Sequence, residues 1–120
     1  MNPLEIAVYV LVLTGGTDPF TCTRVDHAIS CDNGLSAVLN GQGNIEFQTG
    51  VQVVKRPDGT LAFSNGVTSH WGSAGWVQFS NDLAVRRDRD GRFRFSNRMV
   101  CAPADPDAQG RERATCTKGG

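Results

Sequence analysis

Residues 61–66 read Leu61-Ala62-Phe63-Ser64-Asn65-Gly66, and similar hexapeptides recur along the chain at intervals of sixteen residues. The other copies are 29–34, 45–50, 77–82 and 93–98, each with phenylalanine in third place except the first, where Cys31 stands. A second segment and a second turn lie between successive copies. The middle of the chain is therefore a repeat of two segments per unit, confined to residues 29–101.

The turns of the repeat predict how its segments pair. Residues 64–66 (Ser-Asn-Gly) and 57–59 (Pro-Asp-Gly) suit a three-residue hairpin loop whose third residue adopts a left-handed conformation. Asp82 and Arg98 stand where glycine is expected, and aspartate tolerates that conformation better than arginine, so the last turn is the doubtful one. Such loops place Phe63 opposite Val67. They also keep the odd-numbered side chains on one face of the sheet and the even-numbered side chains on the other across every turn.

This register separates an apolar from a polar face. Odd-numbered positions from 29 to 101 carry most of the Ile, Leu, Val and Phe side chains and Trp71, whereas even-numbered positions are mainly polar. We predict an all-β fold: an antiparallel up-and-down meander of about ten short strands, curled or closed into a barrel because so long an apolar face needs cover. The alternative is a β-solenoid with sixteen residues per coil, which would stack Phe63 on Phe79.

The first sixteen residues differ from the rest. Residues 4–13 are apolar apart from Glu5, and they are too few to span a bilayer as a helix. They predict either a signal peptide, although no basic residue precedes them, or a strand buried on both faces. Residues 17–120 then form a single β-repeat domain, with no transmembrane segment.

Four cysteines flank the repeat. No spacing typical of a zinc site is present, so we expect disulfides. Of the three possible connectivities we favour Cys22 with Cys31 and Cys101 with Cys116, because each pair closes a short loop. Disulfides imply a secreted, periplasmic or other extracellular location.

Charge is balanced overall but locally uneven. Twelve basic and twelve acidic residues cancel, which gives no overall field for a specific nucleic-acid partner, yet six of the basic residues lie between Arg86 and Arg98. The register sets Arg86 directly opposite Arg94 on the polar face, with Arg92 nearby on the same strand. Arg98, in the turn that follows, is the fourth candidate binding residue of this cluster. Like charges in opposite positions cost stability, so the cluster suggests a binding site for an anionic partner.

His70 and Trp76 form a second candidate binding site. The register places both on the polar face, with His70 opposite Gln78, and an exposed indole beside amide groups suits sugar or protein contacts. Neither a nucleophile with a base nor a metal-ligand cluster is evident, so no catalysis and no cofactor are predicted.

These features predict a non-catalytic exported domain that recognises an anionic or polar partner, such as a glycan, a protein or a cell surface. The alternative function is a structural subunit of a homo- or hetero-oligomer, whose apolar N-terminal strand packs on a neighbour or completes its sheet.

Overall fold

The computed structural model describes residues 2–72 and 74–119. One helix, α1 (Pro3–Thr14), is followed by twelve strands in an all-antiparallel meander. The strands are β1 (Phe20–Val25), β2 (Ala28–Cys31), β3 (Ser36–Leu39), β4 (Ile45–Phe47), β5 (Gln52–Lys55), β6 (Leu61–Phe63), β7 (Ser69–Trp71), β8 (Val77–Phe79), β9 (Ala84–Arg87), β10 (Phe93–Phe95), β11 (Met99–Ala104) and β12 (Arg113–Lys118). The repeat supplies β2 to β11, the ten strands expected, and β1 and β12 flank it.

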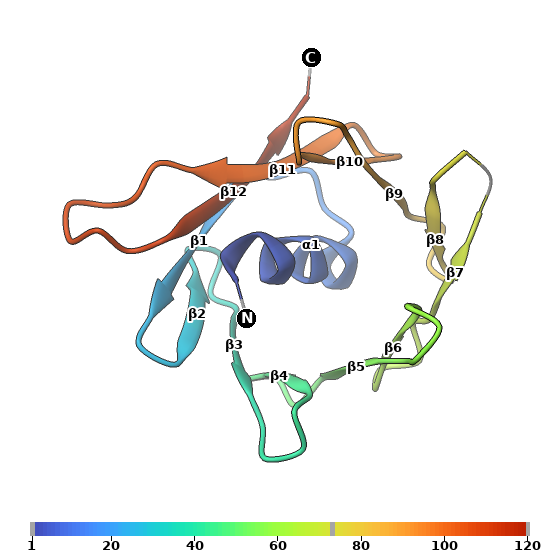
Figure 1. Ribbon diagram of the computed structural model, residues 1–120, viewed down its shortest axis with the longest axis horizontal. Coiled ribbons are helices and arrows are strands. Elements are labelled where there is room, and N and C mark those ends of the chain that lie inside the picture. The colour runs from blue at the N-terminus through green and yellow to red at the C-terminus, as the bar shows by residue number, and fades with distance from the viewer. Residues whose placement is uncertain (1, 73, 120) are drawn as a thin grey trace.

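The sheet curls into a nearly closed barrel, as the sequence predicts. β1 and β12, from opposite ends of the chain, pair with each other. The two edge strands of the sheet are therefore β6 and β7, which are consecutive in the middle of the chain. These two edges approach through a single bridge between Ala62 and Thr68. Figure 1 shows the strands arranged as a ring around α1.

Hydrogen bonds of the hairpin loops explain the repeated hexapeptide. The Phe63 amide donates to the Val67 carbonyl at 2.8 Å, which is the meander pairing and excludes the solenoid. Asn65 Oδ1 accepts from the Val67 amide at 3.2 Å, and Gly66 has a φ of 97°, the left-handed conformation that the loop requires. Asp82 and Arg98 adopt the same conformation, each with a φ of 72°, so the doubtful last turn does form.

The serine of the hexapeptide ties each loop to the strand before it. Ser64 Oγ accepts from the Gln52 amide at 2.8 Å, while the Ser64 amide donates to the Gln52 carbonyl, also at 2.8 Å. Ser80 and Ser96 make the same pair of bonds with Thr68 and Ala84. These bonds extend the pairing of strands that are only three or four residues long.

The N-terminal segment forms a helix inside the barrel, so the predicted buried strand is wrong in conformation. Asn2 caps the helix by accepting from the Glu5 amide at 2.8 Å, and Gly15, with a φ of 62°, ends it by donating to the Leu11 carbonyl at 2.8 Å. A helix satisfies its own backbone groups, whereas a strand in the barrel interior would have no partner for them. Residues 6–12 of the helix are buried on all sides.

Two asparagines of the repeat hold the end of this helix. Asn81 Nδ2 donates to the Val12 carbonyl at 2.9 Å, and Asn97 Nδ2 donates to the Gly16 carbonyl at 3.3 Å. Carbonyls in the last turn of a helix lack partners within the helix, so the repeat supplies them. The helix and the barrel are thus fitted to each other by specific polar contacts as well as by apolar packing.

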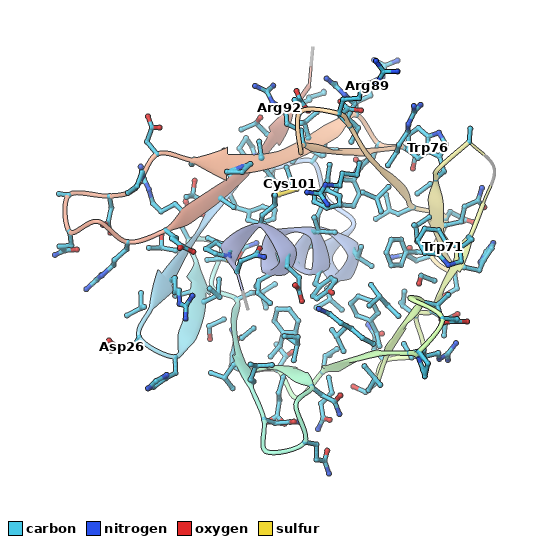
Figure 2. All side chains as sticks on the ribbon, in the orientation of Figure 1. Asp26, Trp71, Trp76, Arg89, Arg92 and Cys101 are labelled. Atoms are coloured by element: carbon cyan, nitrogen blue, oxygen red, sulfur yellow. A yellow bond between two sulfur atoms is a disulfide. The ribbon has the colours of Figure 1, made fainter. Side chains whose placement is uncertain are left out.

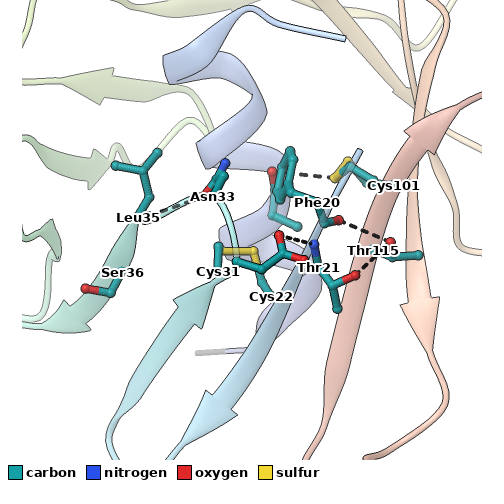
Figure 3. The surroundings of a disulfide bond; sticks show 12 residues. Phe20, Thr21, Cys22, Cys31, Asn33, Leu35, Ser36, Cys101 and Thr115 are labelled. Atoms are coloured by element: carbon teal, nitrogen blue, oxygen red, sulfur yellow. Dashed lines mark hydrogen bonds between the residues drawn. A yellow bond between two sulfur atoms is a disulfide. The ribbon is translucent and has the colours of Figure 1, made fainter. Parts of the chain in front are cut away.

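The cysteines form the two disulfides expected, where the ends of the chain meet. Cys22 lies opposite Cys31 on β1 and β2, and Cys101 lies opposite Cys116 on β11 and β12. Between the two disulfides, β1 pairs with β12, and the Thr115 hydroxyl on β12 donates to the Phe20 carbonyl on β1 at 3.1 Å (Figure 3). The disulfides therefore reinforce the strands that close the barrel through the chain ends.

Candidate functional site

The β9–β10 hairpin carries the arginine pair that the register predicts. Arg86 and Arg94 are direct cross-strand partners, and both are exposed on the outer face. Arg94 forms an ion pair with Asp88, and Arg92 forms one with Asp90 at 3.4 Å. Arg86 has no salt bridge within residues 2–72 and 74–119. Of this arginine pair, Arg86 therefore carries the charge that lacks an acidic partner.

Trp76 and Arg98, two further residues of the predicted binding sites, lie near this pair. β8 and β9 pair with Val77 opposite Val85, so the register continued by one residue sets Trp76 beside Arg86. Trp76, Arg94 and Arg98 line a shallow pocket of about 300 Å³ on the outer face, together with Phe95, Met99, Val100 and Gly119. We call Trp76, Arg86, Arg94 and Arg98 the outer arginine patch. Figure 2 shows Trp76 beside the part of the ring that bears Arg89 and Arg92.

Arg98 is placed in this patch at a cost in backbone energy. It occupies the left-handed position that glycine fills in the equivalent turns at 34, 50 and 66. For a residue with a Cβ this conformation costs about 1–2 kcal/mol. Such backbone strain is concentrated at functional sites, and here it coincides with a cationic side chain next to Trp76.

His70 lies outside the outer arginine patch. It faces Gln78 across β7 and β8, as expected, and is exposed on the outer face. β8 separates it from the strand that carries Arg86, and it does not line the pocket beside Trp76. The structure thus divides the predicted pair, joining Trp76 to the arginines and leaving His70 apart.

The burial of the two tryptophans differs from what parity predicts. Trp71, predicted to be in the core, is 60% exposed, whereas Trp76 is half-buried. Trp71 ends β7 at the barrel rim, where its indole donates to the Asp58 carbonyl at 3.3 Å across the β6–β7 edges. Leu39, two repeats earlier, is likewise 52% exposed. Odd positions at the ends of these strands lie beyond the buried part of the barrel, so parity alone mispredicts them.

A cavity inside the barrel was not anticipated from the sequence. It measures about 520 Å³ and lies between the N-terminal half of α1 and strands β5 to β10. Its lining is mainly apolar and includes Leu4, Val8, Tyr9, Leu61, Val77, Phe79, Val85 and Phe93. Lys55, Arg56 and Arg87 also line it and are exposed, so they mark its open side.

A polar network borders this cavity. Lys55 Nζ lies 2.8 Å from Glu5 Oε1, and the Tyr9 hydroxyl donates to the same oxygen at 3.2 Å. Burial, the Glu5 charge and this hydrogen bond raise the pKa of Tyr9 well above its usual value, so the hydroxyl stays protonated as a donor. Glu5 and Tyr9 are four residues apart, the spacing of neighbours on a helix. That spacing, with an acid in an apolar run, was the only sequence signal for this site.

Within the residues that the structure describes, no group of three His, Cys, Asp or Glu side chains could hold a metal ion. Over the same residues, no helix has the length and apolar character needed to cross a membrane. Comparison of the chain with protein-family models, curated proteins and solved structures finds no match.

Proposed function

We propose that the protein is a non-catalytic recognition domain, exported to an oxidising compartment, that binds an acidic polysaccharide through the outer arginine patch. The observation that carries this proposal is the arrangement of Trp76 beside Arg86, Arg94 and Arg98 on one exposed face. Two disulfides and no free cysteine within the described residues support the compartment.

The chemistry of the patch favours a sugar polymer with acidic groups. A guanidinium presents paired N–H donors that match the oxygens of a carboxylate or sulfate. The Trp76 ring offers an apolar surface beside these donors, and the C–H face of a pyranose packs against such a surface. The anionic groups of a repeating polymer would also offset the repulsion between Arg86 and Arg94, because an anionic group beside the two guanidinium groups attracts both.

The burial of the N-terminal segment supports the recognition function over the alternative function as an assembly subunit. That alternative required the apolar N-terminal segment to be free to pack on a neighbour. Residues 6–12 are instead buried inside the barrel of their own chain. We therefore develop only the recognition function.

The test measures binding to immobilised heparin as a model acidic polysaccharide, at several salt concentrations. We expect the double variant Arg86→Glu/Arg94→Glu to lose at least tenfold in affinity, with a shallower salt dependence. The matched control is Arg24→Glu/Arg111→Glu, which changes the net charge equally at exposed positions on β1 and before β12. Equal affinity of both double variants would refute the patch as the site. Thermal melting of each variant verifies folding.

The chemical nature of the ligand needs its own comparison. Polyglutamate presents carboxylates without sugar rings, and dextran presents sugar rings without charge. We expect both to bind more weakly than heparin, because each lacks one of the two features that the patch combines. Substitution of Trp76 by alanine should weaken heparin binding but leave polyglutamate binding nearly unchanged.

A further inference from the structure

A second space, separate from the outer arginine patch, lies beside α1 on the inner face of the barrel. Protein cores are usually packed so closely that few voids exceed the size of a water molecule. The space beside α1, about 520 Å³, is far larger and lies within the range of small-molecule sites. We propose that this cavity binds a single-chain amphipathic anion, with its alkyl chain inside the barrel and its carboxylate at the rim.

The apolar lining comes from both sides of the cavity. Leu4 and Val8 project from α1, and Val77 and Phe93 project from β8 and β10. Leu4, Val77 and Phe93 are only partly buried, although they pack against the core. An alkyl chain in this position would cover their remaining surface, and burial of such surface contributes about 25 cal/mol per Å².

The rim determines the charge of the ligand. Lys55, Arg56 and Arg87 stand on the open side, against a single acid, Glu5. Glu5 is engaged by Lys55 at 2.8 Å, whereas neither Arg56 nor Arg87 has a salt bridge among the described residues. The guanidinium of Arg87 lies 5.7 Å from the centre of the Phe93 ring, so its charge sits directly over the apolar lining. A carboxylate held over Phe93 would meet the unpaired guanidinium of Arg87.

The shape of the cavity separates this ligand from other classes. Its volume and its position between α1 and strands β5 to β10, with one open side, suit a single alkyl chain of moderate length. The net positive rim disfavours cationic amphiphiles.

The test is isothermal titration calorimetry of the full chain, both disulfides intact, with sodium dodecanoate below its micellar concentration. We expect saturable binding of one molecule per chain, and at least tenfold weaker binding of dodecyltrimethylammonium. Val77→Phe should weaken dodecanoate binding at least tenfold by filling the cavity. The matched control Val54→Phe adds the same volume on the outer face of β5, away from the lining, and should bind normally.

Charge at the rim is tested by Arg87→Glu, with Arg89→Glu as its control, because Arg89 does not line the cavity. We expect a loss of at least fivefold in dodecanoate affinity for the first variant only. Absence of dodecanoate binding by the wild-type chain would overturn the proposal, as would equal binding by Val77→Phe and Val54→Phe. Heparin binding should survive Val77→Phe, so the two proposals can fail independently.

Discussion

Helix α1 should contribute to stability as a part of the core, and Leu11→Ala tests this. Leu11 is 0% exposed and lies in the third turn of the helix, surrounded by the barrel. Truncation removes three buried carbon atoms and leaves a space that the surrounding strands can only partly close. The Leu11 carbonyl keeps its hydrogen bond from the Gly15 amide, so the effect reports packing alone.

The expected cost is about 2–5 kcal/mol, the range for leucine-to-alanine changes in closed cores. Because the strands around α1 are short and joined by tight loops, they have little freedom to collapse onto the helix, and we expect the upper half of that range. For a domain of 120 residues, a loss of about 4 kcal/mol lowers the melting temperature by roughly 16 °C. The control Leu39→Ala, at a position 52% exposed, should cost less than about 0.5 kcal/mol.

The assay is equilibrium unfolding in urea, with disulfides intact and with the mass of the chain measured before and after. The mass matters because a signal peptide, the other interpretation of residues 1–16, would be removed from the exported protein. A cost below about 1 kcal/mol for Leu11→Ala in the full chain would refute the assignment of α1 to the core. Equal costs for Leu11→Ala and Leu39→Ala would refute it as well.

Three further results are expected. Arg98→Gly should stabilise the fold by about 1 kcal/mol in urea unfolding while weakening heparin binding, whereas Asp82→Gly should gain less stability and leave binding unchanged. The hydroxyl and amide of Thr60 lower the pKa of Asp58, so its contribution to stability should be present above about pH 4 and be lost as pH falls below; melting curves of Asp58→Asn should lack that part of the pH dependence. Thiol titration under denaturing conditions should find no free thiol, and four free thiols would refute the oxidising compartment.

The site was only partly accessible to sequence reasoning. The pairing of Arg86 with Arg94 follows from loop length, because a three-residue hairpin loop sets the register of both strands. That Arg98 and Trp76 line one pocket could not be derived in this way, since the two residues belong to different hairpins and Arg98 lies in a turn outside the paired strands. The cavity likewise depends on a helix whose position no local pattern indicates.

Sequence alone determined the strands of the repeat, their register and their inner and outer faces. These features depend on φ preferences, on short loops and on a side-chain period of two, all of which act over a few neighbouring residues. Tertiary structure decided that residues 3–14 are a helix inside the barrel, that Trp71 is exposed, and that a cavity opens beside Glu5. A continuous apolar run has no period, and the exposure of a rim residue depends on what lies above it, so only the assembled barrel could settle these points.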